Sequence, residues 1–300
     1  MTFTTLDPSL TPNVQSNILD NGGMEIWQRG TTFSSFPTLA NTYTADRWYI
    51  GVGSGGSIVA TVSQNSSTVD TGLYSMKVAV TSITSNTIAL KQAVENYQAY
   101  AGKTVTFSMR INSNVTDLFL VINDGVGTTN SSTLSITGAF QTLTVTRTLS
   151  SSLTQLILQV NGFSSGETAY IDSAMLVMGT NSATFVPTNP QVDLARCQRY
   201  FEILSPSVNG YSSYGVVQAT GANFYAWWQF SSPMRTNPTV TFGSPTITVT
   251  NAGTSGFSSV GVQLDSINGI AWGGTLTTSL GSQGNPGFMQ GGTISASADL

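Results

Sequence analysis

The sequence contains no histidine, one cysteine and few charged residues. Without histidine, neither a Ser-His-Asp triad nor a Cys-His pair can form, and a transition-metal site would lack its commonest side-chain ligand. A single cysteine, Cys197, excludes an intrachain disulfide and a thiolate cluster for zinc. We expect Cys197 to be a small buried core residue. Together these absences favour a protein without catalytic activity.

Charge is scarce throughout the chain. Charged residues make up 8% of the 300 residues, whereas ordinary globular proteins have about 25%. The net charge is −4, and Lys and Arg form no cluster. Because nucleic-acid-binding proteins carry a basic patch, we expect no nucleic-acid partner. A surface of hydroxyl and amide groups instead suits repeated contact with identical neighbours.

The sequence also lacks a long apolar run. Residues 1–15 read MTFTTLDPSLTPNVQ and contain neither a basic segment nor a continuous apolar segment of the kind found in signal peptides. No apolar run reaches the length of about 18 residues that a membrane-spanning helix needs. We therefore expect a protein that is made in a cytoplasm and spans no membrane.

What the sequence does contain is mostly short strands and turns. Residues 1–16 show no periodic pattern and predict an extended arm. From residue 17 to residue 188, apolar and polar residues alternate in segments separated by turn clusters, and almost no helix is expected between them. This pattern predicts a jelly-roll β-sandwich. The predicted strands are Asp46–Ile50, Ser57–Gln64, Tyr74–Thr81, Ile88–Ala93, Thr104–Asn112, Leu118–Ile122, Leu134–Ile136, Gln141–Leu149, Leu153–Val160, Thr168–Ala174 and Ala183–Val186.

One segment, residues 189–204, predicts a helix that joins two domains. Pro190 suits a first helical turn, and Asp193 lies near the positive end of the helix dipole. Four apolar residues follow at helical spacing, so one face should pack either within the monomer or against the same helix in a homotrimer. The residues of this face, which are candidates for a trimer seam, are Leu194, Cys197, Phe201 and Leu204.

Residues 205–300 predict a small, glycine-rich C-terminal β domain. The segment Asn223–Phe230 carries aromatic residues at both odd and even positions, so its strand is buried on two sides, or buried on one side and used for contact on the other. Exposed aromatic rings could stack on a sugar or lie in an interface, with packing in the core as the alternative. The candidates are Tyr211, Tyr214, Tyr225 and Trp227, together with Trp48 in the first domain. The predicted strands are Tyr211–Val217, Asn223–Phe230, Thr239–Phe242, Thr246–Thr250, Gly261–Leu264, Gly269–Trp272 and Thr293–Ala298.

Five short motifs are distributed over nearly the whole chain. They are NGGMEIWQRGT at 21–31, TADRW at 44–48, LARCQRYFE at 194–202, PMRTNPT at 233–239 and ADL at 298–300. In this order they resemble motifs of tailed-bacteriophage fibre and minor virion structural proteins. The resemblance implies a jelly-roll domain similar to carbohydrate-binding modules, followed by a small C-terminal β domain.

The resemblance also implies a function. It implies attachment to other virion proteins through residues 1–16, homotrimeric assembly, and a place on the exterior of the particle. We therefore expect a short tail or head fibre or spike that mediates attachment to the host surface and is not an enzyme. The alternatives are a capsid-decorating protein that stabilises the shell, and a glycan-binding module with a host surface glycan as its partner. No collagen-like, β-helical or coiled-coil shaft is present, which favours a short structure.

Jelly rolls of this kind often hold one structural calcium ion near the first and last strands, and the resemblance implies such a site here. Glu25 and Asp172 occupy the matching positions and are the candidate ligands. The alternatives are an ion pair with Arg29 or Arg47 and exposed carboxylates. Arg47 is otherwise expected to be structural, and no other cofactor is expected. The Asp and Glu residues are scattered singly, whereas a glycosidase needs two carboxylates at a set separation, so we expect no catalytic residues.

Overall fold

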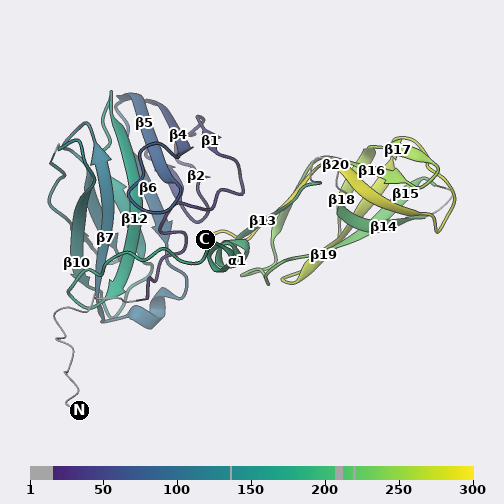
Figure 1. The fold of residues 1–300 in the computed structure, drawn as a ribbon. Helices are drawn as coiled ribbons and strands as arrows, with labels where there is room; N and C mark the ends of the chain where they lie inside the picture. The colour runs from purple at the N-terminus through teal and green to yellow at the C-terminus, as the bar shows by residue number, and fades with distance from the viewer. Residues whose placement is uncertain (1–15, 136, 207–211, 219–220) are drawn as a thin grey trace, which may run out of the picture. The chain divides into compact units, whose positions relative to one another are not determined.

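The computed structural model describes residues 16–300 except 136, 207–211 and 219–220, and the chain is all-β (Figure 1). It forms two compact units, Met1–Asp193 and Leu194–Leu300. The all-β prediction is confirmed: the described residues form three antiparallel sheets, with α1 at Pro190–Gln198 as the α-helix among them. None of the helices in this part of the chain is long and apolar enough to cross a membrane. Of the predicted arm, residues 1–15 lie outside the described residues, as does Tyr211.

The first unit is a sandwich of two six-stranded antiparallel sheets, here called sheet A and sheet B. Sheet A runs in the order β1 (Thr32–Phe33), β4 (Ser57–Asn65), β5 (Ser75–Thr84), β12 (Thr168–Met178), β7 (Thr104–Ser113) and β10 (Gln141–Thr148). Sheet B runs in the order β2 (Asn41–Tyr43), β3 (Tyr49–Val52), β6 (Ile88–Ala93), β11 (Ile157–Asn161), β8 (Phe119–Asn123) and β9 (Thr128–Asn130). A short 3-10 helix, η2 (Tyr97–Tyr100), connects β6 to β7.

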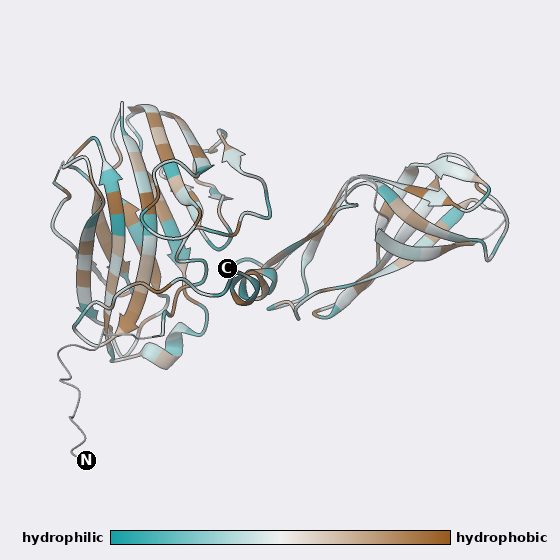
Figure 2. Ribbon diagram, viewed as in Figure 1, coloured by the Kyte–Doolittle hydropathy of each residue, from teal (hydrophilic) through white to brown (hydrophobic). Residues whose placement is uncertain are grey.

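The alternation read from the sequence produces the core between the two sheets. On β7, the side chains of Val105, Phe107, Met109 and Ile111 are completely buried, and Leu158 on β11 is buried from the opposite sheet. Figure 2 shows apolar and polar residues interspersed along the strands of this unit. Each such side chain contributes about 1.5–3 kcal/mol when it leaves water. The apolar faces of the two sheets therefore hold the sandwich together.

Several predicted strand limits differ from the structure, each for a local reason. Asp46–Ile50 was expected to be one strand, but β3 begins at Tyr49 because residues 45–48 form a turn with Arg47 at a φ of 72°. Ala183–Val186 is not a strand, and Phe185 lies instead over Gly23. In Leu134–Ile136, residues 134 and 135 form no strand and residue 136 is not described. The short strands β1, β2 and β9 carry too few residues for alternation to be legible.

The predicted helix 189–204 ends earlier than expected. Asn189 caps α1, since its side chain accepts a hydrogen bond from the Gln191 N–H at 2.9 Å. After Gln198 the chain turns, and β13 (Phe201–Leu204) pairs with β20 (Pro286–Ser297). Helical spacing alone did not reveal this pairing, because the partner strand lies about 90 residues further on.

This correction divides the expected apolar face. Phe201 and Leu204 lie on a strand and do not share a helical face with Leu194 and Cys197, so the predicted four-residue seam is wrong in that form. Cys197 is buried, as expected. A contact between α1 and another subunit stays a prediction.

The second unit is a curved sheet, here called sheet C, which wraps around its own core (Figure 1). Phe224, Trp228 and Trp272 lie at the centre of this core. The expected strands Thr239–Phe242 and Thr246–Thr250 form a single strand that is interrupted by bulges near Gly243. The strand order is β17 (Gly253–Ser255), β16 (Thr239–Val249), β20 (Pro286–Ser297), β14 (Ser212–Gln218), β15 (Asn223–Gln229), β19 (Gly269–Leu276) and β18 (Phe257–Ser266), with β13 paired to β20.

Candidate functional site

The two N-terminal motifs meet in a buried polar cluster centred on Asn21. Its side-chain oxygen accepts hydrogen bonds from the N–H groups of Glu25 and Ile26, and its amide nitrogen donates to the carbonyls of Ile26 and Asp46. Trp48, which is completely buried, donates its indole N–H to the Asn21 carbonyl at 3.0 Å. Trp48 is therefore a core residue and cannot stack on a ligand.

Two arginines complete this cluster with paired charges. Asp46 Oδ1 lies 3.1 Å from Arg29 Nη1. Arg47 is 2% exposed, lies 3.1 Å from Asp20 through its Nε atom, and donates from Nη2 to the Ala93 carbonyl at 2.8 Å. A buried charge is tolerated when it is paired and hydrogen-bonded. The expectation that Arg47 is structural is confirmed.

The three C-terminal motifs meet in the second unit around Arg235. Its guanidinium donates to the carbonyls of Ala298 and Asp299, each at 3.0 Å. Its backbone N–H donates to the Arg199 carbonyl at 2.8 Å, and the Ala298 N–H donates to the Tyr200 carbonyl at 2.7 Å. These contacts hold the end of the chain beside β13, so these motif residues are also architectural.

Glu25 and Asp172, the candidate calcium ligands, both hold the loop of residues 70–74. Glu25 Oε1 accepts hydrogen bonds from the N–H groups of Leu73 and Tyr74, at 2.6 and 3.3 Å. Asp172 Oδ2 accepts from the N–H groups of Asp70 and Thr71, at 2.9 and 3.1 Å. Calcium requires six to eight oxygen ligands.

The two carboxylates by themselves do not make up such a ligand set. Within the described part of the chain, no group of three or more His, Cys, Asp or Glu residues is placed to hold a metal ion. The oxygens of the two candidate residues that contact the loop are already occupied by amide N–H groups. Glu25 and Asp172 thus anchor residues 70–74, and the calcium site stays a prediction because calcium also takes backbone carbonyl oxygens as ligands.

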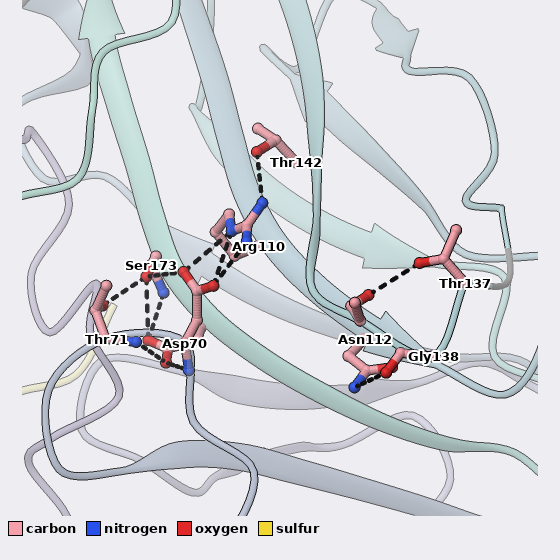
Figure 3. Close-up of polar contacts among 10 residues, drawn as sticks. Asp70, Thr71, Arg110, Asn112, Thr137, Gly138, Thr142 and Ser173 are labelled. Carbon is pink, nitrogen blue, oxygen red and sulfur yellow. Dashed lines mark hydrogen bonds and ion pairs between the residues drawn. The ribbon is translucent and has the colours of Figure 1, made fainter.

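Beside this anchor, a polar cavity of about 350 Å³ opens on the outer face of sheet A. Figure 3 shows the polar contacts among Asp70, Thr71, Arg110 and Ser173, four of its lining residues. Arg110 on β7 binds both carboxylate oxygens of Asp70 at 2.8–3.0 Å and donates to Thr142 Oγ1 at 3.2 Å. Ser173, with a left-handed φ of 52°, places its hydroxyl 2.7 Å from that of Thr71 and 3.2 Å from Asp70. It lies at a β-bulge of β12, a feature that often re-aims a side chain.

The carboxylates around this cavity are engaged with neighbouring groups. Burial raises the pKa of Asp172 to about 6, although amide N–H groups of Thr71, Asp70 and Ser173 act in the opposite direction. Asp70 is held in a two-pronged contact by Arg110, which fixes its orientation. The arrangement ties loop 70–74 to sheet A.

A second cavity, of about 450 Å³, lies over the outer face of sheet B and is here called the outer cleft. Cross-strand pairing aligns its floor: Lys91 on β6 lies opposite Gln159 on β11, and Asn161 lies opposite Phe119 on β8. Residues on one sheet face at such positions are neighbours about 4.5–5.5 Å apart between Cβ atoms. The cleft is also lined by Gly51, Asn86, Thr87 and Phe163.

Two polar groups of the outer cleft lack partners. Asn161 Oδ1 is buried without a hydrogen bond, a state that costs about 1–3 kcal/mol. The side-chain ammonium of Lys91 has no hydrogen-bond or ion-pair partner among the described residues. Burial lowers the pKa of the Lys91 ammonium, with no neighbouring charge to oppose the effect. Both groups belong to a polar site that the protein leaves incomplete.

The predicted aromatic residues of the second unit that are described share the outward face of sheet C. Tyr214 is 71% exposed and Trp227 is 49% exposed, and the strand registers place them side by side on β14 and β15, with Tyr225 in the neighbouring row. The rings of Trp227 and Tyr225 lie close to Gly269 and Gly273 on β19. Covering glycine backbone is a structural role, so Trp227 and Tyr225 pack on β19 while part of this aromatic surface stays exposed.

Sequence reasoning missed the outer cleft. The segment IALKQA, residues 88–93, was read as a strand, and its one lysine carried no motif. Gln159 and Asn161 lie at alternate positions of another strand. The sequence therefore indicated only that this strand and the strand of Lys91 each have a polar outward face. Their proximity depends on a pairing across 68 residues, between Lys91 and Gln159, that alternation does not reveal.

Comparison with known proteins shows similarity of fold. No family model matches the sequence, and no curated protein matches it. Among solved structures, tailspike protein 4 of bacteriophage CBA120, in its enzymatically active domain, matches with a TM-score of 0.38 and 10% identity over 54% of this chain and 21% of that chain. The chain thus spans about a fifth of that tailspike structure.

Carbohydrate-binding modules match as well. The C-terminal family 22 module of Clostridium thermocellum Xyn10B has a TM-score of 0.34 and 20% identity, over 48% of this chain and 91% of the module. The module TmCBM61, in complex with β-1,4-galactotriose, has a TM-score of 0.36 and 15% identity, over 55% of this chain and all of the module. The β-sandwich of the first unit is established by the strand pairing within sheets A and B.

Proposed function

We propose that this protein is a non-catalytic structural protein of a tailed-bacteriophage particle, a short tail or head fibre or spike that attaches the particle to its host. The observation that carries the proposal is the series of five motifs, which resemble those of phage virion proteins and run in the same order from residue 21 to residue 300. Their residues form hydrogen bonds that are buried around Asn21 and partly buried around Arg235. Such a use of shared residues supports a common architecture rather than a common reaction.

Labelling of the phage particle tests this proposal. Antibodies against the purified chain, visualised by immunogold electron microscopy of particles from the phage that encodes it, should decorate the tail or a head fibre. Uniform decoration of the shell would favour the capsid-decorating alternative. Absence of the chain from purified particles, by both labelling and mass spectrometry, would overturn the proposal.

We further propose that the chain assembles as a homotrimer and docks on the particle through residues 1–16. The low charge and the half-exposed aromatic surface of sheet C support contact with identical copies. Analytical ultracentrifugation should give three times the chain mass of 31.6 kDa. A monomer at micromolar concentration counts against the trimer. Removal of residues 1–16 should abolish incorporation into particles without changing the oligomeric state.

Binding of a host surface glycan is a second candidate function, and the outer cleft favours it. The cleft combines amide, hydroxyl and amine side chains with the rings of Phe119 and Phe163. Its volume of about 450 Å³ lies within the range of about 300–1,000 Å³ found for small-ligand sites. A glycan array probed with the full chain should give selective signals that a variant with a blocked cleft, Gly51→Trp, does not give.

A further inference from the structure

The outer cleft has an unbalanced charge, which restricts its ligand. Among its described lining residues Lys91 is the only cation, and none is Asp or Glu. The ammonium is half-buried and lies over Gly51, where an added Cβ atom would come within 2.9 Å of Nζ. The absence of a side chain at residue 51 thus leaves room for the lysine at the floor of the cleft.

The ion pairs of the same unit make the contrast clear. Arg29, Arg47, Arg110 and Arg147 each lie within 3.1 Å of an aspartate oxygen. Lys77 lies over the Tyr170 ring, and Lys103 is exposed to water. Lys91 is neither paired with a carboxylate nor fully exposed. An anion entering the cleft would therefore meet an ammonium group that has lost part of its hydration and has no competing carboxylate.

The other lining groups select a hydroxylated anion. Asn161 lines the cleft, and its Oδ1 is buried without a donor, so a turn of the side chain toward the cleft would let it accept a hydroxyl proton. Gln159, directly opposite Lys91, offers both a donor and an acceptor at the same level of the cleft. The ring of Phe119, across from Asn161, supplies an apolar surface for the C–H face of a sugar ring.

We propose that the outer cleft binds an acidic sugar residue, a uronic or sialic acid, whose carboxylate contacts Lys91 and whose hydroxyl groups contact Asn161 and Gln159. This inference rests on the second candidate function, glycan binding, and specifies the class of sugar. It does not depend on the place of the protein on a virion.

Titration of the full chain with single sugars tests the inference. Glucuronic acid and N-acetylneuraminic acid serve as acidic probes, glucose as the neutral match of the first, and glucose 6-phosphate as a different anion. Binding is measured by isothermal titration calorimetry and by saturation-transfer NMR. At least one acidic sugar should bind about tenfold or more tightly than glucose, since a charge-assisted contact is lost with the neutral sugar. The preference should weaken as salt is raised.

Variants locate the contact. Lys91→Met keeps most of the unbranched apolar stem of the side chain and removes its charge, and it should reduce affinity for the acidic sugar about tenfold or more. Lys91→Arg should retain most of the binding, and Lys103→Met, at an exposed lysine outside the lining residues, should behave as wild type. Asn161→Ala should weaken the acidic and the neutral sugar alike. Circular dichroism melts establish that each variant is folded.

The results distinguish a failure of the acidic-sugar inference from a failure of glycan binding itself. Equal binding of glucuronic acid and glucose, or full binding by Lys91→Met, overturns the acidic-sugar inference and leaves glycan binding in place. Preference for glucose 6-phosphate over both carboxylated sugars overturns it in favour of a phosphorylated ligand. Absence of binding by every sugar overturns the inference and the second candidate function together. None of these results alters the immunogold labelling that tests the virion role.

Discussion

Glu167 gives the first unit a pH dependence that runs opposite to that of most proteins with paired carboxylates. The residue is 1% exposed. Burial raises its pKa from 4.5 to about 7, while hydrogen bonds from the Ser164 N–H at 3.0 Å and the Ser113 hydroxyl at 2.9 Å oppose the rise and Asp117 adds to it. The folded state therefore binds a proton that the unfolded chain releases at a lower pH.

The sign and size of this pH dependence follow from the linkage between proton binding and folding. The contribution of Glu167 to stability is fully present below about pH 4.5 and is lost as the pH rises through about 7. Between pH 5 and pH 8 the loss amounts to about 2.5 kcal/mol of unfolding free energy. Asp172, with a pKa raised by burial to about 6, acts in the same direction over the lower part of this range.

The variant Glu167→Gln isolates the first contribution because an amide does not titrate in this range. Urea unfolding is measured at pH 5 and pH 8, and hydrogen exchange of peptides from β7 and β12 assigns the transition to this unit. Wild type should lose about 2.5 kcal/mol more than the variant between the two pH values. Asp265→Asn, at an exposed carboxylate of the second unit, should leave that transition unchanged. Equal pH dependence of wild type and Glu167→Gln would refute the reasoning.

Three further outcomes are expected. Burial opposes ionisation of Asp124, but hydrogen bonds from three backbone N–H groups and Arg147 lower its pKa to about 2. Wild type should therefore lose stability in thermal melts as the pH falls from about 4 to 2, and the variant Asp124→Asn should lose less over the same range. Arg235→Met should cost the second unit about 1.5–3 kcal/mol in urea unfolding, with Arg235→Lys restoring part of it. Trp228→Ala should destabilise that unit by about 3–5 kcal/mol, clearly more than Trp227→Ala, since Trp228 is 5% exposed and its neighbour 49%; equal losses in calorimetry would contradict the assignment of strand faces.

The sequence predicts most of the strands because period-two alternation is a local signal. Thr104–Asn112 corresponds to β7, and Ile88–Ala93 is β6 without change. The prediction was less successful where pairing with a distant strand determines the secondary structure. Phe201–Leu204 is a strand because it pairs with β20. The local propensity of that segment is compatible with a helix, and pairing with a strand about 90 residues away overrides it.

For the candidate sites, too, the sequence indicates what depends on neighbouring residues and misses what depends on pairing between distant strands. Arg47 was expected to be structural, whereas Trp48 was a candidate for stacking on a sugar, with packing in the core as the alternative; both side chains are buried. Glu167 is preceded by Ser164 in an S-x-x-E pattern, a legible sign that the carboxylate would reach back to the Ser164 N–H. The burial that shifts its pKa comes from strands β7 and β12, whose pairing is not contained in that pattern.

The small number of charged residues in the first unit bears directly on the proposed binding site. In the first unit the aspartates paired with arginine fasten motifs and loops from within: Asp46 holds the N-terminal motif, Asp70 holds its own loop on sheet A, and Asp124 holds the hairpin between β8 and β9. Charges used in this way are neutralised where they lie, which leaves a surface of hydroxyl and amide groups. On such a surface few other charged groups lie near the Lys91 ammonium to compete for an anionic ligand. Lys91 can therefore discriminate an acidic sugar from a neutral one with one charge, a result that a densely charged surface would obscure.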